Sequence, residues 1–134
     1  MAKRLKGKVA LVTGSSSGIG AGVAKAFARE GADLVLNYPN KAEEREIWNV
    51  QKAIEALGRK ALVVKADVSI EAQVKRMVKA ALQEFGQIDI LVNNAGHADR
   101  GAPVQDMSVE MFDRMIGVHL RGTFLSTKYV LPQM

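Results

Sequence analysis

Short apolar runs alternate along the chain with longer segments in which apolar residues recur at helical spacing. The runs are rich in Val, Leu and Ile and do not alternate with polar residues, which is typical of strands buried on both faces of a sheet. They occupy residues 9–12, 34–36, 61–64 and 88–92. We therefore predict four buried strands, each followed by a helix.

Each predicted helix has a recognisable start or end. The first runs from a Gly-rich loop to about residue 30, the second from about 42 to 57, the third ends at 85 and the last ends near 129. The second helix is expected to bury one face, made of Ile47, Val50, Ile54 and Leu57. Ser69 and Ser108 are suited to cap the third and fourth helices, because a hydroxyl can accept from a free backbone N–H in the first turn.

This alternation predicts one α/β domain over residues 1–134 with a doubly wound parallel sheet. Right-handed β-α-β crossovers would place helices on both faces of the sheet. The predicted strand order is 3-2-1-4, which leaves the fourth strand at an unpaired edge.

Composition narrows the chemistry and the partners. The chain has no Cys and two His, so thiolate catalysis and Cys- or His-rich metal sites are not expected. Most of the net charge of +5 lies in a basic N-terminal stretch, residues 3–8, which we interpret as a solubilising end and not a nucleic-acid surface. Nothing resembles a signal peptide or a membrane span, so we expect a cytoplasmic protein with no nucleic-acid or membrane partner.

A loop rich in Gly and Ser joins the first strand to the first helix. It comprises Gly14, Ser15, Ser16, Ser17, Gly18, Ile19 and Gly20. Its glycines allow a sharp turn and close approach to a ligand, and the helix that follows directs free N–H groups at the loop. We expect a pyrophosphate there; the alternative is a tight strand-to-helix turn without a ligand. A P-loop is excluded, because Ile19 and Gly20 stand where Gly-Lys is required.

Three motifs in register resemble those of the short-chain dehydrogenase/reductase family. Residues 13–20 match its T-G-x-x-x-G-[IL]-G loop, Asp67-Val68 its adenine-contacting pair, and residues 93–96 its N-N-A-G signature. The resemblance extends from Gly7 to Met134. It implies a Rossmann-type NAD(P)-binding domain of an oxidoreductase that transfers hydride between nicotinamide and a small-molecule carbonyl or alcohol. Relatives of this family are commonly homo-oligomers.

The resemblance also implies the cofactor-binding positions. They would be loop residues 14–20 together with Asn37, Tyr38, Asp67, Val68, Asn94, Ala95, Gly96 and Val118. The loop would hold the pyrophosphate, Asp67 and Val68 the adenine, and residues 94–96 the adenosine ribose. Two alternatives stay open: Asp67 as an ordinary turn residue at a strand end, and the amides of Asn93 and Asn94 as ties between adjacent strand ends.

The residues after the second strand bear on the choice between NAD and NADP. A carboxylate there would bind the ribose 2′-hydroxyl of NAD and repel the 2′-phosphate of NADP. Asn37 has no such charge, and Lys41 is a candidate phosphate ligand. Ser17 argues the other way, since NADP enzymes of this family often carry a basic residue at its position. The sequence thus favours NADP(H) over NAD(H).

The family's catalytic residues are not found in this sequence. The family uses a Ser and a Tyr-x-x-x-Lys pair, and neither Tyr38 nor Tyr129 is followed by Lys at the fourth position. We therefore predict a fold truncated after the fourth strand and its helix, without the catalytic half and inactive by itself. His119 stands where the family has Asn, and we favour a structural, water-holding role over that of a general base.

Three interpretations of this pattern are open. The favoured one is an oxidoreductase sequence cut short; the alternatives are a non-catalytic nucleotide- or partner-binding module, and one piece of an enzyme completed by another chain. The fourth strand favours the first, because residues 90–92 are apolar and a stable short module would carry charges at this edge. The substrate is not predicted, although residues 97–106 would flank it in this family.

Overall fold

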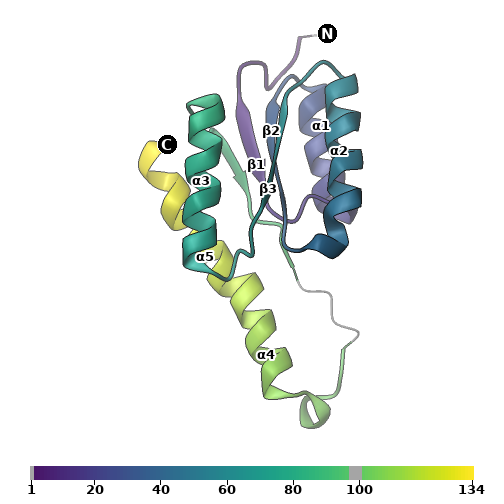
Figure 1. Cartoon of the computed structure of the whole chain (residues 1–134), viewed down its shortest axis with the longest axis vertical. Helices are drawn as coiled ribbons and strands as arrows, with labels where there is room; N and C mark the ends of the chain where they lie inside the picture. Colours follow the sequence, from purple (N-terminus) through teal and green to yellow (C-terminus); the bar gives the residue numbers. More distant parts are fainter. Residues whose placement is uncertain (1, 97–100) are drawn as a thin grey trace.

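The computed structural model describes residues 2–96 and 101–134. Within these ranges four parallel strands form one sheet in the order β3-β2-β1-β4, as predicted (Figure 1). The strands are β1 Val9–Val12, β2 Asp33–Tyr38, β3 Ala61–Lys65 and β4 Ile90–Val92. In the centre of the sheet Leu11 pairs with Val35 on one side and with Leu91 on the other.

Helices cover both faces of the sheet, which confirms the doubly wound fold. On one side lie α1 Gly18–Arg29 and α2 Glu44–Ala56, and on the other α3 Glu71–Phe85 and α5 Gly122–Val130 (Figure 1). Each face has its own core. Ala24, Leu34 and Ile47 are fully buried in the first, and Met77 and Leu125 in the second.

The C-terminal helical run differs from the single helix predicted by the sequence. It consists of α4 Val109–Met115, a π-helical segment Ile116–Arg121 and α5, followed by a 3-10 turn Leu131–Gln133. Its start is as predicted: the Ser108 hydroxyl accepts from the Met111 N–H at 3.1 Å. The π segment inserts one wide turn, and π turns of this kind recur at functional sites. It brings Val118 and His119 to the pocket described below.

Three local predictions are wrong. Ser69 does not cap α3; its N–H and hydroxyl donate to the Asp67 carboxylate at 2.9 and 2.6 Å, and Ile70 precedes the helix instead. Leu57 lies beyond the end of α2 and is 44% exposed, outside the buried face. The fourth strand begins at Ile90, because the backbone of Ile88 pairs with the Gln133 amide at 2.9 and 2.8 Å.

Candidate functional site

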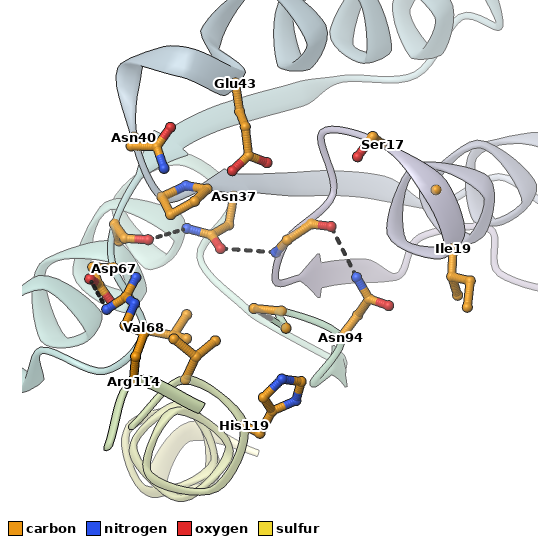
Figure 2. A pocket seen from close by; sticks show the side chains of 17 residues that line it. Ser17, Ile19, Asn37, Asn40, Glu43, Asp67, Val68, Asn94, Arg114 and His119 are labelled. Atoms are coloured by element: carbon orange, nitrogen blue, oxygen red, sulfur yellow. Dashed lines mark hydrogen bonds and ion pairs between the residues drawn. The ribbon is translucent and has the colours of Figure 1, made fainter. Parts of the chain in front are cut away.

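A pocket of about 470 Å³ opens at the carboxyl ends of the strands, where parallel sheets of this kind bind ligands (Figure 2). Most of the sequence-predicted positions line it, namely Gly14, Ser17, Gly18, Ile19, Asn37, Asp67, Val68, Asn94, Ala95, Gly96, Val118 and His119. Ser15, Ser16, Gly20 and Tyr38 do not. Pro39, Asn40, Glu43, Ala66 and Arg114 also line it, and sequence reasoning missed them.

The Gly-rich loop is shaped by close contacts between backbones. Gly14 has a φ of +62°, and a Cβ built on it would lie 2.7 Å from Ala95 Cα. A Cβ on Gly20 would overlap the carbonyl oxygen of Gly14. These two glycines therefore let the loop fold against the end of β4 and the start of α1.

The first turn of α1 is open to an anion. Its N-cap, Ser17, makes no side-chain capping hydrogen bond, and the first turn carries no acidic residue. The free N–H groups and the positive end of the helix dipole therefore face the pocket edge at Ser17 and Gly18. Ile19, 79% exposed at the same edge, offers an apolar surface to a ligand.

Thr13 ties the ends of β1 and β4 together. Its Oγ1 accepts from the N–H groups of Asn94 and Ala95 at 3.0 and 2.9 Å. In return the Asn94 side chain donates to the carbonyls of Thr13 and Gly14 at 3.1 and 2.9 Å. Of the two structural ties proposed from sequence, the Asn94 one is present. The Asn93 amide instead reaches Thr127 on α5, at 3.2 Å.

Asn37 is a structural centre of the pocket floor. It is 1% exposed, and its Oδ1 accepts from the Gly14 N–H at 3.0 Å. Its Nδ2 donates to the carbonyl of Ala66 at 3.0 Å (Figure 2) and to the carbonyl of Val64 at 3.3 Å. The amide thus joins the Gly-rich loop, β2 and the end of β3, and its polar atoms are already in use.

The serines of the loop divide into structural and pocket-facing residues. Ser15 is fully buried, and its Oγ accepts from the Asn37 N–H at 2.9 Å. Ser16 is 4% exposed and donates to the Glu43 carboxylate. Ser17 lines the pocket. Tyr38 is buried in the core beside α2, and Lys41, the predicted phosphate ligand, is exposed away from the pocket lining.

At the far side of the pocket Asp67 is held by three donors. Its Oδ1 accepts from Ser69, and its Oδ2 pairs with Arg114 Nη1 on α4 at 2.9 Å. Burial acts to raise the pKa of Asp67, but the hydrogen bonds from Ser69 and Arg114 outweigh it and the pKa is lowered. Asp67 is therefore both a turn residue and a wall of the pocket, and Arg114 anchors α4 beside it.

Replacing Asp67 by Asn is expected to lower the free energy of unfolding by about 1–2 kcal/mol at neutral pH. Because the folded-state pKa lies below the unfolded value, the ionised carboxylate stabilises the fold above that value, and this stabilisation is lost as the pH falls through the folded-state pKa. The gap between Asp67→Asn and the parent should narrow as the pH falls below the unfolded value of about 3.9. Urea unfolding at several pH values measures it. Asp113→Asn, an exposed site on α4, should show no such gap, and a pH-independent gap for Asp67→Asn would contradict the assignment.

Two residues of the π segment complete the pocket. Val118 is buried at 7% exposure, and the His119 ring lies against the backbone of Gly96. A Cβ on Gly96 would approach His119 Cε1 to 2.7 Å, so glycine permits this position of the ring. Residues 97–100, part of the predicted substrate flank, lie outside the described residues.

No cluster of three or more His, Cys, Asp or Glu suited to a metal ion is found among the residues that the structure describes. In the described ranges, no helix has both the length and the apolar character needed to cross a bilayer.

Comparisons with known proteins agree with this geometry. The model of the short chain dehydrogenase family matches residues 8–134. Glucose 1-dehydrogenase 2 of Bacillus subtilis is 41% identical over 137 residues, covering 100% of this chain and 51% of the relative. An uncharacterized oxidoreductase of Methylorubrum extorquens is 43% identical over 125 residues, covering 93% of this chain and 49% of the relative.

Solved structures of short-chain dehydrogenases are also similar to this chain. A short chain dehydrogenase from Burkholderia cenocepacia in complex with NADP superposes with a TM-score of 0.91 at 37% identity, covering 98% of this chain and 52% of the other. A blue fluorescent protein from a metagenomic library, in complex with NADPH, superposes with a TM-score of 0.90 at 34% identity. The match covers 97% of this chain and 52% of the other. The chain spans about half the length of the curated relatives it matches. It belongs to the short-chain dehydrogenase/reductase family.

Proposed function

We propose that the pocket binds a nicotinamide dinucleotide. The observation that carries this proposal is the Gly14 cradle beside the open N-terminus of α1, at the end of the sheet where Asp67 and Asn94 also meet. A Cβ at Gly14 would fill the cradle, so the loop suits close approach of a pyrophosphate to backbone N–H groups. The NADP- and NADPH-bound structural neighbours support this assignment.

The residues that line the pocket suggest where the pyrophosphate, the adenine and the ribose of the nucleotide would lie. The pyrophosphate would lie at Ser17 and Gly18, and the adenine between Asp67 and Val68 on the far side. The Asp67 carboxylate, ionised and fixed by Ser69 and Arg114, retains lone pairs to accept from an adenine amino group. The ribose would lie beside residues 94–96, where Gly96 and Ala95 leave room.

The reaction that fits this domain is hydride transfer between nicotinamide and a carbonyl or alcohol. Reduced nicotinamide would supply the hydride to a carbonyl, or oxidised nicotinamide would accept it from an alcohol, and the residues of this pocket would bind and orient the nucleotide. The sequence contains no Tyr-x-x-x-Lys pair, so we expect these 134 residues to supply binding and not the proton transfer of the reaction. His119 lines the pocket from the π segment beside the Gly96 backbone, and the role we propose for it is structural and water-holding.

We propose NADP(H) as the preferred cofactor. The second strand ends without a carboxylate, since Asn37 is an amide whose atoms are engaged by backbone groups. Two of the similar structures hold NADP or NADPH. Lys41 is exposed next to Asn40 and is not among the residues that line the pocket, so the proposal does not depend on it.

Binding of NADPH and NADH to the purified polypeptide, measured by calorimetry, tests the proposal. We expect saturable binding of both, tighter for NADPH, and loss of binding in Gly14→Asp, whose side chain would enter the cradle. Circular dichroism of the parent and of Gly14→Asp is the control that tests whether each protein is folded. A folded protein that binds neither nucleotide would overturn the proposal.

The surface formed by the last helices is the candidate site for contact with a protein partner. Large apolar side chains are exposed along α4, the π segment and α5, at Val109, Phe112, Ile116, Leu120 and Phe124. Homo-oligomerisation through this face, the expectation from the family, stays a proposal. Sedimentation of the purified chain at several concentrations tests it.

A further inference from the structure

An acidic side chain reaches the pocket from an unexpected place. Rossmann sheets that bind NAD commonly carry an acid near the end of the second strand, where it meets the ribose 2′-hydroxyl. Here β2 ends at Tyr38 without one. Glu43 comes from the 3-10 turn that follows, Lys41–Glu43, and lines the same pocket.

The Glu43 side chain is directed by a contact with the Gly-rich loop. Glu43 is the N-cap residue of α2, yet it makes no capping hydrogen bond to its own helix. Its Oε1 accepts instead from Ser16 Oγ at 2.5 Å. The backbone of the turn is closed by the Glu43 N–H donating to the Asn40 carbonyl at 3.2 Å. Figure 2 shows the carboxylate pointing into the pocket between Asn40 and Ser17.

The charge of Glu43 is not neutralised by a neighbour. The other lining carboxylate, Asp67, is paired with Arg114 on the far side of the pocket. In the part of the chain that the structure describes, Glu43 forms no salt bridge. Its carboxylate therefore presents an uncompensated negative charge at the loop side of the pocket.

On the proposed placement of the nucleotide, this position would face the 2′ side of the adenosine ribose. With the pyrophosphate at Ser17 and the adenine at Asp67, the ribose that links them would lie between these residues. Asn37, Asn40 and Glu43 line that interval. Asn37 is committed to backbone groups, so the groups of this interval left to meet a 2′ substituent are Asn40 and Glu43.

We propose that Glu43 is a specificity-determining residue that weakens binding of a 2′-phosphorylated nucleotide and so limits the preference for NADP(H). The inference rests on the proposed nucleotide binding. A carboxylate beside a phosphate is unfavourable through like-charge repulsion. A 2′-hydroxyl carries no charge and escapes this penalty.

The test compares Glu43→Gln with the parent, using NADPH and NADH as probes in calorimetry at low salt. We expect the dissociation constant of NADPH to fall by about tenfold in the variant, the size of one close charge interaction, and that of NADH to change by less than about twofold. The difference should shrink in about 0.5 M salt. Glu44→Gln is the matched control: it removes the same charge one residue away, outside the pocket lining, and should leave both affinities unchanged.

The outcomes separate the two proposals. If the parent binds both nucleotides and Glu43→Gln leaves their affinity ratio unchanged, the role of Glu43 is wrong and nucleotide binding stands. Equal weakening of both nucleotides in Glu43→Gln also overturns it, because Glu43 would then act by holding the loop through Ser16. If the folded parent binds neither, the proposed function fails, and the role of Glu43 with it.

Discussion

Replacing Gly14 by Ala is expected to weaken nucleotide binding at least about a hundredfold and to lower the free energy of unfolding by about 2–4 kcal/mol. Two costs add. The φ of +62° is strained for any residue with a Cβ, and the new methyl carbon would lie 2.7 Å from Ala95 Cα. The nearby atoms are the backbone and Cβ of Ala95 and not the tip of a flexible side chain, so the loop must move away from the end of β4. That movement displaces the backbone N–H groups that would face the pyrophosphate.

Calorimetry with NADPH measures the first effect, and urea unfolding followed by circular dichroism measures the second. Gly22→Ala is the matched control. Gly22 lies within α1, and a Cβ there would meet nothing within 4 Å. Since Ala is a better helix former than Gly, the free energy of unfolding of this variant should rise by about 0.5–1 kcal/mol, and its affinity for NADPH should be unchanged. Normal binding and stability in Gly14→Ala would mean that the cradle is not set by this contact.

The two central strands were largely predictable because burial on both faces leaves a simple pattern, whereas β3 and β4, also predicted as buried, are only partly buried at the edges of the sheet. The first strand is predicted with its observed ends, since Val9 to Val12 is an unbroken apolar run. The second is longer than predicted, because its ends are polar. Asp33 and Asn37 belong to β2 but break the apolar pattern, and Asn37 is buried only because its amide is bonded to three backbone groups. Pairing with partners distant in sequence cannot be seen in a local pattern.

The prediction of one continuous C-terminal helix was wrong for a similar reason, because contacts with distant residues are not visible in a local pattern. Its periodicity predicts a continuous helix, and the π segment depends on tertiary packing. Gly122, which begins α5, lies against Val68; a Cβ there would approach Val68 Cγ2 to 2.6 Å. The position of α5 is thus fixed by a contact with the segment after β3, and the preceding turn adjusts to it. Ser69 likewise looked like a cap but bonds Asp67, which is a competing acceptor two residues away.

The candidate site was predictable where chemistry depends on local spacing. The three glycines of the loop and the strand-end residues Asp67 and Asn94 follow from position along the chain. Arg114 and Glu43 do not. Each is one of many charged residues on a helical segment, and its place at the pocket follows from how α4 and the 3-10 turn pack against the sheet. The sequence argument for NADP(H) therefore weighed Lys41, which lies outside the pocket lining, and not Glu43, which lines it.

Asn37→Asp is expected to destabilise the fold by about 3–5 kcal/mol and not to convert the site to NAD(H). From sequence alone this change would supply the acid that NAD-binding sheets carry after the second strand. In the structure the side chain is 1% exposed, and its Nδ2 donates to the carbonyls of Val64 and Ala66. A carboxylate of the same shape cannot donate. It would place a buried negative charge against two carbonyl oxygens, with only the Gly14 N–H to offset it.

The loss should also narrow as the pH falls, but at higher pH than the gap for Asp67→Asn, because the two pKa shifts are opposite in sign. Burial beside two acceptors favours the neutral carboxylic acid, so the folded-state pKa of the introduced group would lie above its unfolded value of about 3.9. The protonated form can donate to one of the two carbonyls. The stability gap between Asn37→Asp and the parent should therefore be full at neutral pH and narrow as the pH falls through that raised pKa.

Urea unfolding at matched pH values measures this gap. Asn40→Asp is the control, because it introduces the same charge three residues away at an exposed position whose side chain makes no capping hydrogen bond. It should change stability by less than about 0.5 kcal/mol. A stable Asn37→Asp protein that binds NADH more tightly than the parent would show that the Asn37 amide is dispensable to the fold. A destabilised one would show that the fold requires the amide at position 37, so that this position is not free to serve as a ribose ligand.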